Sequence, residues 1–302
     1  PPPMRPRPRL ARLHGHLLTA AIVAGSMLVA SLAGASDVRL YEVKVPLGGT
    51  TEADRGTALA EAMKAVAVRV SGRRDAAASA AVTAADPARY VQRYAAGTDR
   101  TLTVGFDGAS VERLLQQAGL TFWAAERPLT LVDVVAEDRS TALEAAELRG
   151  LPIAWQSGAV ATGPAQAVLR GTPNGSQFDW SFSHGGETVQ GRGTLADGIH
   201  LAADTLAARY APPSSRGTST LVLRVKGMDD LRRYTGVLGY LESMSLVRRV
   251  AVEALEGDVL RLRVAVRGDR DLLGRVAALE GKLKPVVRGA DATADADFIF
   301  QP

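Results

Sequence analysis

Hydrophobic positions recur in three successive groups along the chain, and each group mixes strand-like with helix-like spacing. In the first group, residues 42–46 alternate polar and apolar side chains, as a half-buried strand does. Residues 59–70 then carry an apolar stripe at helical spacing. The pattern further predicts a short helix at Tyr90–Tyr94, a strand at 102–106 and a helix at 111–118. Together these elements predict an N-terminal α+β unit over residues 37–128.

A second group follows and predicts a middle α/β unit over residues 129–211. Its expected strands lie at 129–135, 151–155 and 165–170, with helices at 140–149 and 197–210. Phe178, Trp180 and Phe182 alternate along one strand of a predicted hairpin, so one face of that strand is aromatic. We expect this row to lie in the core, because one face of a two-layer sheet must be buried. A ligand groove is the alternative.

The third group follows a Pro/Ser/Gly-rich linker at residues 212–217. Its order of strand, helix, strand, strand, helix predicts a C-terminal ferredoxin-like unit over residues 217–288. An Ala/Asp-rich tail is expected over residues 289–302, although Phe298–Phe300 offers a final strand. The predicted fold class is therefore α+β, with three small two-layer α/β sandwich units, the last ferredoxin-like in order.

The segment before these groups has the pattern of a secretion signal. From Met4 it shows a basic region, an apolar run over residues 17–32 and the small residues Ala33-Gly34-Ala35. This order predicts a signal peptide over residues 4–35 that engages the Sec export machinery. The apolar run is short for a membrane span, so we expect cleavage, no stable span afterwards and a periplasmic protein. The alternative is an inner-membrane protein held by the uncleaved signal.

Charge and cysteine content exclude several classes of function. The net charge of +4 comes from four arginines of the predicted signal, and the rest of the chain is formally neutral. The basic pI therefore gives no support for a nucleic-acid partner, and we expect none. The absence of cysteine removes disulfides, thiol catalysis, cysteine metal sites and the acylated cysteine of a lipoprotein.

The sequence contains no recognisable motif for catalysis, cofactor binding or metal binding. After the predicted signal only His184 and His200 remain, and neither stands in a close cluster of metal ligands. No nucleophile elbow, phosphate-binding loop or dinucleotide-binding fingerprint is present. We therefore predict no catalytic residue, no cofactor and no metal. Two carboxylates that meet in space could still form an acid/base pair, which leaves a hydrolase as an alternative.

One group of charged residues stands out in the third unit. Alternation places these side chains together on the sheet face opposite the helices, and they are Arg224, Lys226, Arg249, Arg261 and Arg263. The ordinary interpretation is a solvated sheet face, and the functional one is a surface for an anionic partner. A second candidate is the loop with Arg73 and Arg74, which either caps the preceding helix or binds a partner.

Local sequence motifs also resemble a known family. They are Tyr41-Glu-Val43, the helix end at Val68–Asp75, Tyr90–Tyr94, Trp123 and Arg127-Pro128. Over about residues 38–210 the chain resembles a proteobacterial envelope protein family catalogued as a domain of unknown function, family 2066. The resemblance implies a secreted protein and no catalytic residues. We therefore expect a non-enzymatic envelope accessory or adaptor protein, whose partner is an envelope protein or an anionic envelope component.

Overall fold

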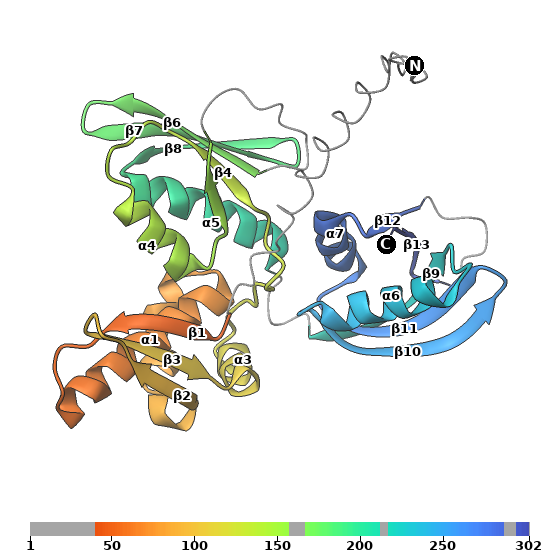
Figure 1. The fold of residues 1–302 in the computed structure, drawn as a ribbon, viewed down its shortest axis with the longest axis horizontal. Helices are drawn as coiled ribbons and strands as arrows, with labels where there is room; N and C mark the ends of the chain where they lie inside the picture. Colours follow the sequence, from red (N-terminus) through yellow and green to blue (C-terminus); the bar gives the residue numbers. More distant parts are fainter. Residues whose placement is uncertain (1–39, 157–166, 212–216, 287–293, 302) are drawn as a thin grey trace, which may run out of the picture. The chain divides into compact units, whose positions relative to one another are not determined.

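Three separate β-sheets, each flanked by helices, make up the computed structural model (Figure 1), which describes residues 40–156, 167–211, 217–286 and 294–301. The fold is α+β, as the sequence pattern predicts; the first two sheets lie within residues 37–128 and 129–211, and the third extends beyond residue 288. The predicted signal peptide at residues 4–35 lies outside the described residues.

The first sheet has the strand order β1-β3-β2 and is antiparallel. Its strands are β1 (Glu42–Pro46), β2 (Val91–Ala96) and β3 (Thr101–Phe106). Helices α1 (Glu52–Ser71) and α3 (Gly108–Gln117) bury their apolar stripes against it, and the short helices η1 (Arg74–Ala78), α2 (Ala80–Thr83) and η2 (Pro87–Arg89) connect α1 to β2. Thr51 and Asp54 form a capping box at the start of α1, so the helix begins where local sequence chemistry places it.

The short helix predicted at Tyr90–Tyr94 is wrong, because most of this segment belongs to β2. The four-residue spacing of the two tyrosines looks helical, but Tyr94 is 53% exposed and buries little. Pairing with β3 decides the conformation instead, and Tyr94 lies opposite Val104 in the register. Such a pairing joins residues that local periodicity does not connect.

The second sheet has the order β5-β4-β6-β7-β8. Strand β4 (Thr130–Asp133) runs parallel to β5 (Ile153–Trp155) and β6 (Ala167–Asn174), and β6, β7 (Gln177–His184) and β8 (Glu187–Gly193) form an antiparallel meander. Helices α4 (Ser140–Arg149) and α5 (Leu195–Tyr210) pack against each other beside this sheet (Figure 1).

The aromatic row on β7 is part of the core, as expected. Trp180 is 3% exposed and Phe182 is 1% exposed. Two glycines make room for the indole: an added Cβ would lie 2.5 Å from the Trp180 ring at Gly171 and 2.4 Å from it at Gly198. The indole Nε1 donates to the carbonyl of Thr194 at 3.0 Å, so its polar atom is satisfied within the core.

The third sheet has the order β10-β11-β9-β13-β12. Its elements are β9 (Thr218–Lys226), α6 (Leu231–Ser243), β10 (Val247–Glu256), β11 (Val259–Arg267), α7 (Arg270–Glu280), β12 (Leu283–Pro285) and β13 (Ala296–Phe300). The first five follow the expected ferredoxin-like order. The tail predicted over residues 289–302 is wrong for Ala296–Phe300, because this segment forms β13, parallel to β9 and antiparallel to β12. Phe298 and Phe300 are buried, so hydrophobic burial holds the strand in place.

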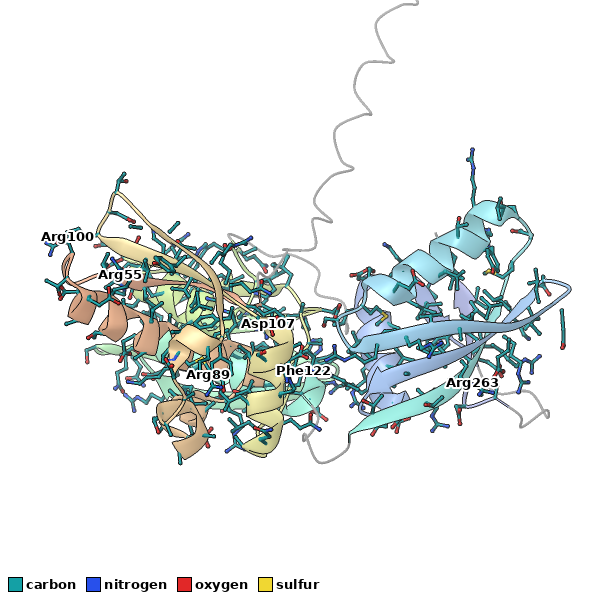
Figure 2. The ribbon with its side chains drawn as sticks, turned by 90° about the horizontal axis from the view of Figure 1, so that it is seen from below. Arg55, Arg89, Arg100, Asp107, Phe122 and Arg263 are labelled. Carbon is teal, nitrogen blue, oxygen red and sulfur yellow. The ribbon has the colours of Figure 1, made fainter. Side chains whose placement is uncertain are left out.

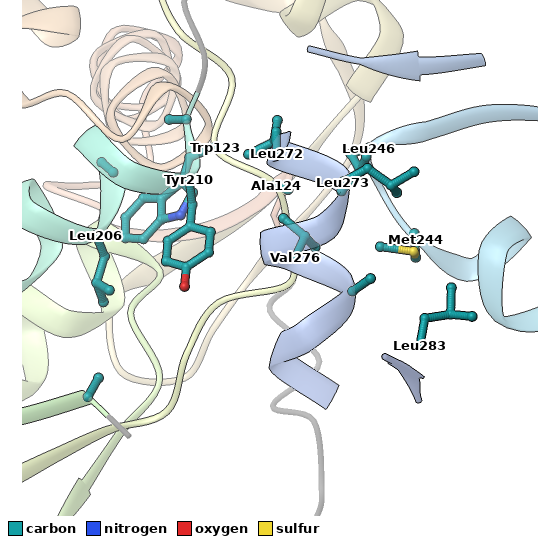
Figure 3. Packing of buried hydrophobic residues seen from close by; sticks show 14 of the residues in the cluster. Trp123, Ala124, Leu206, Tyr210, Met244, Leu246, Leu272, Leu273, Val276 and Leu283 are labelled. Atoms are coloured by element: carbon teal, nitrogen blue, oxygen red, sulfur yellow. The ribbon is translucent and has the colours of Figure 1, made fainter. Parts of the chain in front are cut away.

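Buried side chains form two clusters. One lies under the first sheet, and the other contains core residues of the second and third sheets. Figure 3 shows part of the second cluster, with Trp123 beside Tyr210 of α5 and with Leu272, Leu273 and Val276 on α7. Trp123 also donates a backbone hydrogen bond to α1, from its N–H to the carbonyl of Val70 at 2.8 Å.

Candidate functional site

The five cations predicted on the third sheet lie together on one face, which we call the basic face: Arg224, Lys226, Arg249, Arg261 and Arg263. In the strand register Arg261 lies opposite Arg224, while their neighbours Leu223 and Leu262 are buried on the helix side. Successive side chains on a strand point to opposite faces, so the cations point away from α6 and α7. Arg263, labelled in Figure 2, has a side chain that is 62% exposed.

Two carboxylates partly neutralise the basic face. Glu253 accepts from Arg261 Nε at 3.0 Å and from Arg263 Nε at 2.7 Å. These hydrogen bonds lower the pKa of Glu253. Asp297 of β13 lies 3.8 Å from Arg224 Nε. The face therefore stays basic, but less so than the sequence prediction implied. Alternation along β10 from Arg249 reaches Glu253, so the sequence alone could have placed this carboxylate on the basic face.

The second predicted candidate, the loop with Arg73 and Arg74, is held by ion pairs. Arg73 Nε donates to Asp75 Oδ1 at 2.9 Å, and this bond raises the pKa of Arg73. Arg74 Nη2 lies 3.2 Å from Asp204 Oδ2 of α5. Gly72 ends α1 in the left-handed conformation, so neither arginine is needed as the helix cap. Each of the two guanidinium groups is therefore paired with a carboxylate, and the loop is not part of the basic face.

Sequence reasoning missed three arginines that are buried among the described residues: Arg69, Arg127 and Arg149. Among the described residues, the guanidinium of Arg127 donates to five main-chain carbonyls: those of Ala124 (3.0 Å), Arg149 (2.5 Å), Gly150 (3.0 Å), Arg69 (2.7 Å) and Trp123 (3.1 Å). It also stacks on the Trp123 ring at 3.9 Å. Burial, and after it the like charges of Arg69 and Arg149, lowers the pKa of Arg127 well below its usual range.

Arg149 extends this network towards α5. Its Nη2 donates to the carbonyl of Gly72 at 2.9 Å and to Asp204 Oδ1 at 2.7 Å. His200 lies next to it, with Nδ1 3.4 Å from Arg149 Nη1, and burial and the nearby cations lower the pKa of His200. The network therefore ties the end of α1 to α4 and α5, and it serves the fold more directly than it serves a ligand.

A groove runs between β1, α1 and α4, and it has a volume of about 580 Å³. Its lining carries more carboxylates than cations: Asp54, Glu61, Glu144 and Glu147 against Lys44 and Arg69. Sequence reasoning missed this groove, because its walls come from segments about 100 residues apart and no local pattern links them.

The described residues contain no group of three or more His, Asp or Glu side chains that could hold a metal ion. His184 is buried, with its Nε2 2.8 Å from the hydroxyl of Tyr210. Within the same part of the chain, no helix combines the length and apolar character that crossing a membrane requires.

Comparison with known proteins gives one family match. Residues 35–124 match the model of a domain of unknown function, DUF8605. This match covers the first sheet with α1 and α3, and it confirms the coarser prediction of a domain of unknown function. Searches of curated proteins and of solved structures gave no significant match.

Proposed function

We propose that the protein is a non-enzymatic adaptor of the proteobacterial cell envelope, exported to the periplasm, which binds an anionic envelope component through the basic face. Export is supported by the leader pattern at residues 4–35. The envelope role is supported by the resemblance of residues 38–210 to the envelope family numbered 2066, which extends beyond the shorter family match.

The observation that carries the proposal is the basic face itself. Five cations stand on adjacent strands, where neighbouring backbones lie about 4.8 Å apart, so their spacing is fixed by the sheet. Asp297 lies beside Arg224, and Glu253 forms ion pairs with Arg261 and Arg263. A broad face with fixed positive charge suits a partner that presents several negative groups, such as phosphorylated lipid headgroups.

The test is charge reversal at the most open positions of the face. We expect Arg249→Glu combined with Arg263→Glu to reduce binding to anionic phospholipid vesicles about thirtyfold, because about 1 kcal/mol is lost for each of the two cations near an anionic surface. Arg261 stays in place to pair with Glu253, so folding should change little. Vesicle co-sedimentation and circular dichroism measure the two effects.

The matched control carries the same charge change on the helix side of the same unit. Arg232→Glu with Arg270→Glu changes exposed residues of α6 and α7. This control should bind vesicles as the unchanged protein does. Equal binding by all three proteins, or equal losses in both variants, would contradict a role for the basic face.

Export is tested separately. Fractionation and N-terminal sequencing should find a protein that starts near Ser36 in the periplasm. Recovery of the full-length chain in the inner membrane would favour the uncleaved anchor instead.

A further inference from the structure

Within the described part of the chain, strand β1 has an open edge, because it is an outer strand of the order β1-β3-β2. On either side of it, the N–H of Phe106 donates to the carbonyl of Tyr41 at 2.9 Å, and the N–H of Leu47 donates to the carbonyl of Arg100 at 2.8 Å. Antiparallel strands alternate hydrogen-bonded and non-hydrogen-bonded pairs. Val43 and Val45 therefore turn their backbone groups to β3, and the N–H and C=O of Lys44 point to the open edge.

The groove described above is lined by Val43 to Pro46 of β1, and residues of α1 and α4 form its other walls. Arg69 is one of the residues that line it. Its Nη1 donates to the carbonyl of Glu42 on β1, and its Nη2 donates to the carbonyl of Glu147 on α4 at 2.6 Å. One buried guanidinium thus bridges the strand and the helix and fixes their separation. Lys44, Val45 and Pro46 line the groove as well.

Charge in the groove comes mainly from α4. Lys44 forms an ion pair with Asp99, with Nζ 2.6 Å from Oδ2. On α1, Asp54 belongs to the capping box and Glu61 lies 2.8 Å from Lys64. The remaining carboxylates, Glu144 and Glu147, are exposed on α4, and Glu147 also attracts the guanidinium of Arg69. Leu148, on the same wall, is 36% exposed and offers an apolar contact.

We propose that this groove binds an extended, basic segment of a partner protein, which adds a strand to the edge of β1. Main-chain hydrogen bonds to Lys44 would give affinity, and alternate side chains would give specificity. The Lys or Arg side chains of the segment face Glu144 and Glu147, and its apolar side chains contact Leu148. A second copy of this chain fits less well, because its own acidic α4 would meet the same two carboxylates.

The inference is tested with peptides and the full chain. The probe is a fluorescein-labelled octapeptide that alternates Lys and Val, measured by fluorescence polarisation. A Glu/Val octapeptide is the charge control. A Lys/Val octapeptide with N-methyl groups at alternate backbone nitrogens is the hydrogen-bond control. We expect only the unmethylated Lys/Val peptide to bind, because the groove needs both positive charge and main-chain donors.

Variants of the chain locate the binding. Glu144→Lys with Glu147→Lys should weaken peptide binding about tenfold, since two attractive charge contacts become repulsive. The matched control, Glu242→Lys with Glu256→Lys, changes exposed residues of α6 and β10 and should bind normally. The Arg249→Glu, Arg263→Glu variant should also bind the peptide normally, which separates this inference from the proposed function.

Three results would overturn the inference. Equal binding of the methylated peptide would exclude strand addition. Unchanged binding by the Glu144→Lys, Glu147→Lys variant would place the peptide elsewhere. A dimer in sedimentation that this variant dissociates would show that a second copy occupies the groove.

Discussion

Replacing Arg127 by lysine is the sharpest test of the buried arginine network. The substitution keeps a positive charge and a long side chain. It removes the planar guanidinium, whose five donor contacts reach carbonyls in three regions of the chain: residues 123–124, Arg69 and residues 149–150. We expect Arg127→Lys to destabilise the folded protein strongly, although the change is conservative in charge.

The magnitude follows from counting donors. A lysine ammonium has three donors, so at least two of the five carbonyl acceptors lose their partner. Each unsatisfied buried polar group costs about 1–3 kcal/mol, which gives a loss of about 2–6 kcal/mol in the free energy of unfolding. The lysine also loses the planar stacking that places the guanidinium 3.9 Å from the Trp123 ring.

The lysine variant should also show a distinctive pH dependence. Burial lowers the pKa of an ammonium group, whereas the unfolded chain keeps a lysine pKa near about 10.4. Between these two values the unfolded state binds more protons, so the stability of the variant rises with pH. The deficit relative to the unchanged protein should therefore shrink as the pH increases from 7 towards 10.

Urea unfolding followed by tryptophan fluorescence measures both effects, and Trp123 lies directly beside the substitution. Arg232→Lys, on the exposed face of α6, is the control and should change stability by less than about 0.5 kcal/mol. If Arg127→Lys loses no more than this control, and its stability has the same pH slope, the five carbonyl contacts do not stabilise the fold as argued.

Three further predictions follow from single contacts. Trp180→Ala should lower the free energy of unfolding by about 3–5 kcal/mol, measured by urea unfolding. Gly198→Ala should lower it by about 1–3 kcal/mol, because the added Cβ would lie 2.4 Å from the indole of Trp180. A loss below about 1 kcal/mol in both variants would contradict the packing. Hydrogen bonds from Lys44 and Thr101 lower the pKa of Asp99 to about 2, so its stabilising contribution is lost as the pH falls from the ordinary value of 3.8 through about 2. NMR titration of Lys44→Met should show a higher pKa for Asp99. Burial lowers the pKa of His200, so folding stability should fall as the pH drops below about 6.5, and His200→Gln should flatten this slope in urea unfolding at pH 7 and 5.5.

Local patterns predicted much of the fold because they act over a few residues. The capping box at Thr51 and the apolar stripe that follows it are readable without any tertiary contact. Strand β2 and strand β13 were missed or left open for the opposite reason. β2 is exposed and takes its conformation from β3, and β13 lies parallel to β9, about 70 residues earlier in the chain.

The same distinction applies to the candidate sites. The basic face was predictable, because alternation along single strands places Arg224, Arg261 and Arg263 by a period of two. The groove was not, since Lys44 on β1 and Glu147 on α4 meet only after the chain folds. The role of Arg127 could not be predicted either, because its partners are backbone carbonyls. Every residue has a backbone carbonyl, so the sequence does not show which carbonyls accept a hydrogen bond from Arg127.

The basic face and the groove should respond differently to salt, and this difference tests whether they are two surfaces with different physics. Binding at the basic face depends on exposed cations, and charges more than about 8 Å apart are largely screened at physiological ionic strength. Strand addition at β1 depends partly on main-chain hydrogen bonds, which salt screens much less. Raising the salt concentration should therefore release anionic vesicles before it releases the Lys/Val peptide. An adaptor built in this way could exchange its anionic partner while keeping its peptide partner. If both probes dissociate over the same salt range, peptide binding is mainly electrostatic, and the open edge of β1 contributes little to it.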